Sequence, residues 1–338
     1  MITLKGLSYR YPGSRTEALR AVDLAASSGS VTVVAGESGS GKTTLLRLLA
    51  GFVAPERGTI DIGDQRVSEP GRAVAPEERG VGVVFQEFAL FPHLTVEQNV
   101  SFGLHGAGKA QRAERVRECV AMLGIEALKE RYPHELSGGQ AQRVAVARAL
   151  APAPRILVMD EPFNNLNVAL RHELVPLVAD VLRSTGITAV VVTHDPQEAY
   201  ELADRMVLLK DGAVEQEGTA AELYHLPRTR YVAHFFGPVN EVPLDSPLAD
   251  ALAPLELPVT DASTLVVRPE TIALVEPGRG AATATVAEAR FAGPHTIVEL
   301  RGAWDGTLRA HVAAPAPPVG ATVGLRIGVE AQAPVLGV

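Results

Sequence analysis

The chain has 338 residues, of which 46% are hydrophobic and 21% are charged. This length and this ordinary globular composition predict about two folded domains and exclude a disulfide-stapled miniprotein, a fibrous chain and a mostly disordered one. The 31 basic and 39 acidic residues give a formal net charge of −8, the opposite of the balance that clamps nucleic-acid backbones, so we expect no nucleic-acid partner.

Cysteine usage and hydropathy bear on the compartment. The single cysteine, Cys119, cannot form an internal disulfide, which favours a reducing, cytoplasmic compartment. No stretch approaches the ~18 uninterrupted apolar residues of a membrane-spanning helix. The sequence therefore predicts a chain that performs any membrane function through a partner.

The first 240 residues alternate apolar runs with helical stretches. Buried strands are expected at Val31–Ala35, Val81–Phe85, Ile156–Met159 and Ala189–Thr193. Helices are expected at Thr43–Ala50, Gln140–Leu150 and Val168–Ser184. This alternation is typical of an α/β domain with a largely parallel sheet.

Polar residues or glycine follow each of the four expected strands. They are Gly36, Gln86, Asp160 and His194. Ligands of open α/β sheets bind at the carboxyl ends of the strands. We therefore expect these four positions to converge on one site.

The first of these positions opens a phosphate-binding loop. The segment Gly36-Glu-Ser-Gly-Ser-Gly-Lys-Thr43 matches G-x-x-x-x-G-K-[ST] between a strand and a helix. Its glycines let backbone N–H groups surround the phosphates, and Lys42 is expected to reach the β- and γ-phosphates. The loop by itself leaves small-molecule kinases, GTPases and motor ATPases open. The nucleotide-binding residues expected here are Gly36, Ser38, Gly39, Ser40, Gly41, Lys42, Thr43 and Thr44.

A second glycine-containing loop narrows these possibilities. Leu136-Ser-Gly-Gly-Gln140 precedes a helix that Pro152 closes. An ordinary N-cap is the alternative interpretation of Ser137. However, this loop lies about twenty residues before Asp160-Glu161 and accompanies the phosphate loop and His194. The set resembles the nucleotide-binding subunits of ATP-binding-cassette (ABC) transporters over roughly residues 1–235.

The resemblance implies a fold and an architecture. The fold is an α/β P-loop NTPase over residues 1–237, with a helical subdomain at about 87–150. It also implies a head-to-tail homodimer, in which each ATP lies between the phosphate loop of one subunit and the second loop of the other. The residues of that second loop are Ser137, Gly138, Gly139 and Gln140.

Roles for individual residues follow from the same resemblance. Tyr11 is expected to stack on adenine, with a plain core or edge-strand tyrosine as the alternative. Lys42, Gln86, Glu161 and His194 are expected to be catalytic: Glu161 polarises the attacking water, and His194 contacts the γ-phosphate. Mg²⁺ is expected to be held by Thr43, Gln86 and Asp160. The cofactors implied are ATP and Mg²⁺.

One segment departs from the family pattern. After Asp160-Glu-Pro-Phe163 the family usually continues Ser-Ala-Leu-Asp, whereas this chain reads Asn164-Asn-Leu-Asn167. Asn167 keeps the size of aspartate but loses its charge. This puts communication between subunits in doubt more than ATP binding, and we expect hydrolysis to survive.

The remaining residues, 238–338, form a second predicted domain. From Glu241 to the C-terminus there are 11 acidic residues, 6 arginines, no lysine and 11 of the 24 prolines. Short strands are expected at Leu265–Val267, Thr283–Val286, Thr296–Leu300 and Thr322–Ile327. This pattern predicts a small all-β module, and the resemblance identifies it with the oligonucleotide-binding-like TOBE domain of importer ATPases, which is expected to be regulatory.

The function implied is ATP hydrolysis that energises solute import through separate membrane permease subunits. Residues Phe88–Val100 resemble the segment that docks on a permease, and a solute-binding protein outside the cytoplasm is expected to act indirectly. The subunit would then lie peripherally on the cytoplasmic face of the membrane. Residues 131–139 and Val267-Arg-Pro-Glu270 look most like ferric-iron importers, with polyamine, sulfate, thiamine and sugar importers as alternatives. A soluble ABC ATPase and a regulatory ATP-binding module are the alternative classes.

Overall fold

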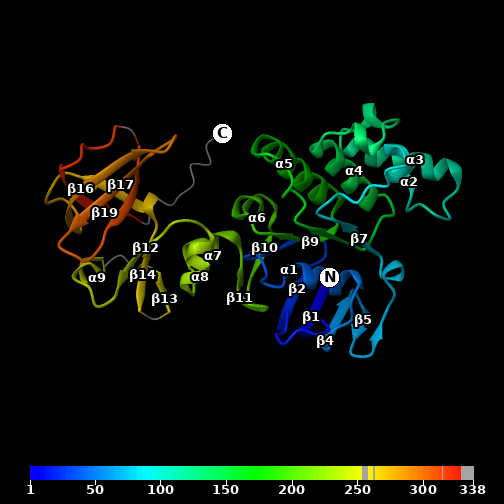
Figure 1. The fold of residues 1–338 in the computed structure, drawn as a ribbon, viewed down its shortest axis with the longest axis horizontal. Helices are drawn as coiled ribbons and strands as arrows, with labels where there is room; N and C mark the ends of the chain where they lie inside the picture. The colour runs from blue at the N-terminus through cyan, green and yellow to red at the C-terminus, as the bar shows by residue number, and fades with distance from the viewer. Residues whose placement is uncertain (253–257, 262, 314, 329–338) are drawn as a thin grey trace. The chain divides into compact units, whose positions relative to one another are not determined.

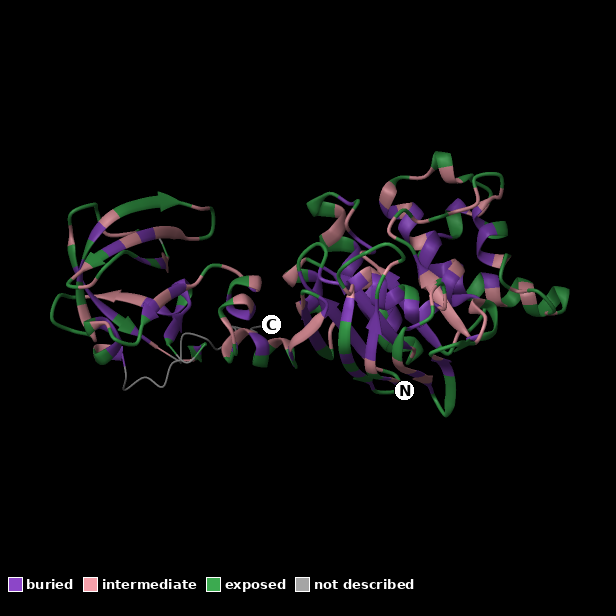
Figure 2. Cartoon of the chain, turned by 60° about the horizontal axis from the view of Figure 1, so that its bottom comes forward, coloured by how far each residue is buried: buried purple, intermediate pink, exposed green. Residues whose placement is uncertain are grey.

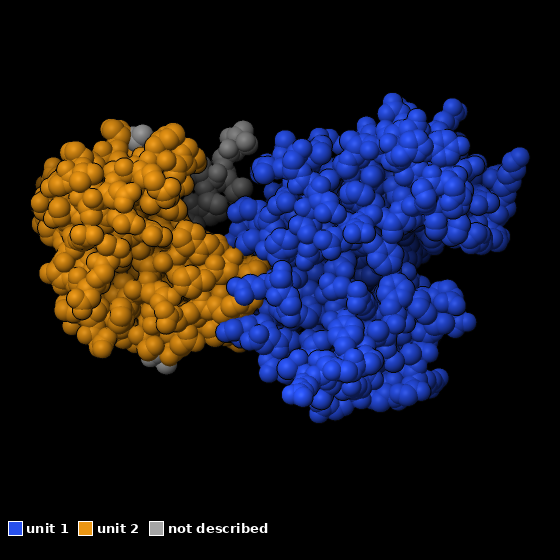
Figure 3. Space-filling model, in the orientation of Figure 1, with its two compact units in different colours: residues 1–220 blue, residues 221–338 orange. Residues whose placement is uncertain are grey.

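The computed structural model describes residues 1–252, 258–261, 263–313 and 315–328 (Figure 1). The chain divides into two compact units, Met1–Ala220 and Ala221–Val338, which are coloured separately in Figure 3. The predicted domain boundary at 237–238 stays a prediction. Among the described residues, no helix is long and apolar enough to cross a membrane.

A six-stranded sheet forms the centre of the first unit. Its order is β11-β10-β3-β9-β8-β7, with every pair parallel except β10–β11. The four strands expected from the sequence are confirmed as β3, β7, β8 and β9. The strands are β3 (Val31–Ala35), β7 (Val81–Val84), β8 (Ile156–Asp160), β9 (Thr188–Thr193), β10 (Arg205–Lys210) and β11 (Ala213–Gly218).

A second sheet of the first unit is antiparallel, with the order β2-β1-β4-β5-β6. These strands have no clear signature in the sequence, because several of them alternate buried with exposed residues and therefore lack a continuous apolar run. The strands are β1 (Ile2–Tyr9), β2 (Leu19–Ala26), β4 (Arg57–Ile62), β5 (Gln65–Glu69) and β6 (Arg72–Ala73).

The helices of the first unit pack on these sheets and on one another. They are α1 (Lys42–Ala50), α2 (Val96–Ser101), α3 (Lys109–Met122), α4 (Gly138–Leu150), α5 (Val168–Thr185) and α6 (Pro196–Leu202). The helical subdomain expected at about 87–150 stays a prediction. One hydrophobic cluster joins α1 to strands of both sheets, and Figure 2 shows the buried residues concentrated there. The helix that follows the phosphate loop is therefore anchored in a core that both sheets share.

Arg79 closes the carboxyl end of α1. Its side chain donates to the carbonyls of Leu48 and Leu49 at 2.7 and 3.0 Å and to that of Val74 at 2.8 Å. The residue is only 1% exposed, and burial lowers the pKa of its guanidinium. A cation here satisfies terminal helix carbonyls and interacts favourably with the helix dipole.

The second unit contains two antiparallel sheets, ordered β12-β14-β13 and β15-β19-β16-β17-β18. The strands are β12 (Asn240–Pro243), β13 (Val259–Thr260), β14 (Thr264–Val267), β15 (Ile272–Val275), β16 (Ala282–Phe291), β17 (Thr296–Gly302), β18 (Leu308–Val312) and β19 (Thr322–Ile327). The helices are α7 (Ala220–His225), which begins at the unit boundary, α8 (Arg230–Phe235) and α9 (Pro247–Leu252).

Two buried polar residues organise this second unit. The Asn240 amide donates to the carbonyls of Val267 and Arg309 and accepts from the Arg309 N–H, which links β12 to β14 and β18. Arg268, from the Val-Arg-Pro-Glu segment, donates to the Ala233 carbonyl at 2.9 Å and lies over the Tyr224 ring. The predicted all-β module is confirmed. Its proline-rich start includes β12, and Pro243 is tolerated there because β12 is an edge strand.

Replacing Arg79 by methionine should destabilise the first unit by about 3 kcal/mol, because buried carbonyls lose a charged donor. Urea unfolding followed by circular dichroism would measure this change. Arg72→Met is the matched control, since the Arg72 side chain is 83% exposed and its ion pair with Glu69 spans 3.9 Å. Equal stabilities of the two variants would contradict the role of Arg79.

Candidate functional site

Strand register brings four predicted site residues to one edge of the six-stranded sheet. Ala35 pairs with Thr193, Val192 with Asp160, and Met159 with Val84. The residues that come next along these four strands are Gly36, His194, Glu161 and, one position beyond Phe85, Gln86. The carboxyl ends of β3, β9, β8 and β7 therefore present these residues side by side.

Glycine is required in the phosphate loop because neighbouring backbone approaches it closely. Gly36 and Gly41 have φ angles of +150° and +105°. A Cβ on Gly36 would lie 2.4 Å from the Leu209 carbonyl oxygen, and one on Gly41 would lie 2.6 Å from that of Ala18. The loop is thus fitted between the start of β2 and the end of β10. Ser38 and Gly39 are exposed at its tip, whereas Ser40 and Thr44 are buried.

Lys42 begins α1 and turns back into this loop. Its Nζ donates to the carbonyls of Gly36 and Glu37, both at 2.8 Å. Burial lowers the pKa of the ammonium, and the carboxylates of Glu161 and Asp160 oppose that effect. The charge is held at the concave side of a loop whose N–H groups and helix N-terminus also favour anions.

Thr43 and Asp160 form a second contact at the same edge. The Thr43 hydroxyl donates to Asp160 Oδ1 at 3.2 Å. Burial raises the pKa of Asp160, and the hydrogen bond from Thr43 works against that rise. One hydroxyl and one carboxylate oxygen fit the preference of Mg²⁺ for oxygen ligands, with its other positions left to phosphate and water.

Glu161 and His194 meet beside this pair. His194 Nδ1 lies 3.3 Å from Glu161 Oε2, and the two side chains are 44% and 16% exposed. Glu161 has a φ of +42°, which is strained for a residue with a Cβ. A partly buried carboxylate beside an imidazole can orient and polarise a water molecule.

Gln86 and Tyr11, the two other predicted site residues, have separate contacts. The Gln86 carbonyl accepts a hydrogen bond from Asn165 at 3.1 Å, and no hydrogen bond of its side chain is present among the described residues. The Tyr11 hydroxyl lies 3.1 Å from the Thr44 hydroxyl and accepts from Arg47 at 3.1 Å. Tyr11 is therefore attached to α1, the helix that follows the phosphate loop.

The second loop is a capped helix start. Ser137 accepts from the Gln140 N–H at 3.4 Å, and the Gln140 side chain accepts from the Ser137 N–H at 3.0 Å. This capping box begins α4. Within the described residues, no hydrogen bond joins this loop to the phosphate loop.

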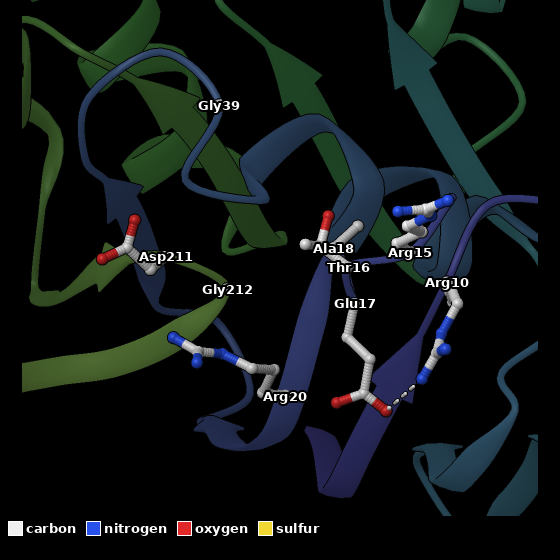
Figure 4. A pocket seen from close by; sticks show the side chains of 9 residues that line it. All are labelled: Arg10, Arg15, Thr16, Glu17, Ala18, Arg20, Gly39, Asp211 and Gly212. Atoms are coloured by element: carbon white, nitrogen blue, oxygen red, sulfur yellow. Dashed lines mark ion pairs between the residues drawn. The ribbon is translucent and has the colours of Figure 1, made fainter.

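A cavity of about 570 Å³ lies against the tip of the phosphate loop at Gly39 (Figure 4). Arginines 10, 15 and 20 line it, and Glu17 pairs with Arg10 at 3.5 Å. Lys42, Thr43, Asp160 and Glu161 do not line it. No motif in the sequence points to these arginines. Arg15 and Arg20 lie between Tyr11 and the expected strand that begins at Val31.

Comparisons with known proteins identify both parts of the chain. Residues 19–164 match the family model "ABC transporter", and residues 265–333 match "TOBE domain". The Fe(3+) ions import ATP-binding protein FbpC of Mesorhizobium japonicum is 46% identical over 72% of this chain and 67% of its own length. The chain belongs to the ABC transporter family. As an ABC ATP-binding protein, it is an ATPase.

Some other relatives of this ABC ATPase are named for different substrates. The sulfate/thiosulfate import ATP-binding protein CysA of Mesorhizobium japonicum is 44% identical over 68% of this chain and 67% of its own. The spermidine/putrescine import ATP-binding protein PotA 1 of Pseudomonas aeruginosa is 43% identical over 71% of this chain and 67% of its own. The Fe(3+) ions import ATP-binding protein FbpC 2 of Rhizobium meliloti is 43% identical over 68% of this chain. The match spans 58% of the length of FbpC 2.

Solved structures agree with the fold of the first unit. The dimeric ATP-binding cassette MJ0796 bound to ADP and Pi superposes with a TM-score of 0.57 and 33% identity, covering 65% of this chain and 99% of that one. CbiO1 from Clostridium perfringens, part of a cbiONQ complex, superposes with a TM-score of 0.61 and 30% sequence identity. The superposition covers 66% of this chain and 89% of CbiO1. The predicted P-loop NTPase fold is therefore confirmed.

Asp160→Asn should raise the unfolding midpoint of the nucleotide-free ATPase by a few degrees at neutral pH. The pKa of Asp160 is raised in the folded state, so its ionisation as pH rises through that pKa removes stability. Asparagine removes this charge and keeps an acceptor for Thr43. The difference in unfolding midpoint should disappear at acidic pH, where aspartic acid in the wild type and asparagine in the variant are both uncharged.

The same variant should lose Mg²⁺-dependent ATP hydrolysis by at least about 100-fold. Thermal unfolding at several pH values and a phosphate-release assay measure the two effects. A stability loss at neutral pH, or retained turnover, would contradict this interpretation of Asp160.

Proposed function

We propose that this ABC ATPase is the ATP-hydrolysing subunit of an import complex that takes up Fe(3+) through separate membrane permease subunits. One observation supports ATP hydrolysis as the activity of this site. The Thr43–Asp160 and Glu161–His194 contacts converge beside Lys42 at one edge of the sheet. These contacts gather a phosphate-binding cation, oxygen ligands for Mg²⁺ and a general base in one place.

In this proposal the phosphates of ATP lie in the loop Gly36–Thr43, and Lys42 neutralises the β- and γ-phosphate charge. Mg²⁺, held by Thr43 and Asp160 with Gln86 nearby, supplies further charge neutralisation when bound. A water oxygen bonds to the γ-phosphorus as the bond to the β–γ bridging oxygen breaks, giving ADP and phosphate. Glu161 accepts the water proton, and His194 orients the γ-phosphate.

The adenine ring would stack on Tyr11, and the remaining side of the nucleotide would be covered by a second copy of the chain through its Ser137–Gln140 loop. The dimeric state of the MJ0796 cassette supports this arrangement. ATP then joins two subunits, and hydrolysis loosens them. The conformational change is available to do work on an attached permease.

A groove in the helical part of the first unit is the proposed permease contact. It has a volume of about 440 Å³ and an aromatic lining that includes Phe85, Phe91 and Phe102. The ring centroids of Phe91 and Phe102 are 4.2 Å apart, with the rings tilted by 39°. Arg148 donates to the carbonyls of Phe88 and Ala89, both in left-handed backbone conformations. Such a rigid, apolar surface on the predicted docking segment suits a permease helix on the cytoplasmic face.

Cargo is assigned from the relatives. The FbpC proteins of Mesorhizobium japonicum and Rhizobium meliloti are Fe(3+) importer subunits by name. The sulfate and spermidine importer subunits are nearly as similar to this chain as the FbpC proteins are. Sulfate and spermidine are therefore the alternative substrates. An extracytoplasmic solute-binding protein would select the cargo in each case.

Reconstitution tests the proposal. The chain, its permease and its binding protein in liposomes should accumulate Fe(3+) in an ATP-dependent manner, whereas sulfate and spermidine should not accumulate. Glu161→Gln should bind ATP with unchanged affinity and lower turnover by at least about 100-fold. Uptake of sulfate or spermidine instead would reject the iron assignment, and wild-type turnover equal to that of Glu161→Gln would reject the hydrolytic site.

Phe102→Glu should uncouple transport from hydrolysis. Phe102 is 42% exposed in the groove, and a carboxylate there disfavours an apolar helix. We expect uptake to fall at least about tenfold while the ATPase rate of the chain without its permease is retained. Phe291→Glu is the matched control, because Phe291 is 76% exposed on β16 of the second unit. Equal uptake by both variants would argue against the groove as a docking site.

A further inference from the structure

Three asparagines occupy the loop between β8 and α5, where the family pattern has Ser-Ala-Leu-Asp. Each has a different contact. Asn167 caps α5 by accepting from the Leu170 N–H at 2.9 Å. Asn165 donates to the Gln86 carbonyl at 3.1 Å, and Asn164 donates to Glu161 Oε2 at 3.0 Å.

The capping contact shows the role of Asn167 within its own chain. Asparagine and aspartate are about equally good N-caps. The loss of charge at this position therefore leaves the start of α5 intact. The unusual feature of the loop is instead the amide of Asn164, which touches the proposed general base.

The direction of the Asn164 contact is fixed by chemistry. A carboxylate only accepts hydrogen bonds, so the NH₂ group of the amide must face Glu161. His194 Nδ1 lies 3.3 Å from the same atom, Oε2. Within the described part of the chain, no hydrogen bond or ion pair reaches Oε1. The two carboxylate oxygens are therefore in different environments.

The Glu161 backbone is held as well. Its N–H donates to the Val192 carbonyl at 3.0 Å, and its carbonyl accepts from the Asn164 N–H at 3.2 Å. With the backbone fixed at a φ of +42°, the side-chain torsions are the main remaining freedom. The bond from Asn164 Nδ2 restricts them.

We propose that Asn164 is a positioning residue for ATP hydrolysis, which holds Oε2 of Glu161 so that Oε1 is the atom that accepts the proton of the attacking water. This inference rests on the proposed hydrolytic function. When the water oxygen bonds to the γ-phosphorus and the bond to the bridging oxygen breaks, the proton moves to Oε1 while Oε2 stays hydrogen-bonded. An N–H donor also stabilises negative charge on the carboxylate before the proton arrives.

Three substitutions separate positioning from simple space filling. Asn164→Ala removes the donor and should lower kcat about tenfold. Asn164→Asp keeps the shape but replaces the donor with a like charge, and should lower kcat about 100-fold. Asn164→Ser restores a shorter donor and should lie between wild type and alanine. If Asn164 only filled space, aspartate would be the mildest change and alanine the most severe.

The Michaelis constant provides a second readout. Asn164 has no hydrogen bond with Lys42 or Thr43 in the structure, so KM for ATP should stay within about twofold in all three variants. Gln111→Glu is the matched control for the added charge, because this exposed amide lies on α3. It should leave kcat unchanged.

The experiment uses the full chain, with steady-state ATPase kinetics and thermal unfolding measured for each variant. A folded Asn164→Asp variant with the wild-type kcat, or a kcat order that follows side-chain size, would overturn the role of Asn164. A parallel rise in KM would overturn it too. If the wild type itself turns over no faster than Glu161→Gln, the proposed function fails, and this outcome differs from each of the others.

Discussion

Parallel pairing of β3, β9, β8 and β7 in register is the constraint on which the rest of the molecule depends. Each of these strands ends within one residue of its neighbour in the sheet. The residues that follow are consequently held by paired strands of one sheet. The phosphate loop, Glu161 and His194 can therefore lie within a few ångströms although they come from distant parts of the sequence.

Several energetically unfavourable local features occur at the carboxyl ends of these strands. Gly36 and Gly41 adopt backbone conformations that leave no room for a side chain, Glu161 is strained, and the buried Asp160 has a raised pKa. Each of these features costs stability, and the large core shared by α1 and both sheets offsets that cost. Arg79, at the other end of α1, stabilises the helix that the phosphate loop enters.

The loop after β8 links the site to its surroundings through amides. Asn164 contacts the Glu161 carboxylate, Asn165 contacts the Gln86 backbone, and Asn167 begins α5. The loop therefore connects α5 and the segment after β7 to the Glu161 carboxylate. The aromatic groove follows that same segment, so the proposed permease contact and the hydrolytic site share a short connection within the first unit.

The sequence by itself determined the phosphate loop, the four strands of the parallel sheet and the all-β module, because each has a local signature: a glycine spacing, a continuous apolar run, or β-branched segments between prolines. It missed the antiparallel sheet, whose alternating strands give weaker signals. Only the tertiary structure revealed that Arg79 closes α1, that arginines 10, 15 and 20 line a cavity beside Gly39, and that Asn164 touches Glu161. These features depend on which side chains meet in space. The direction of a side chain in an irregular loop is set by the packing of the whole unit, and no local pattern encodes it.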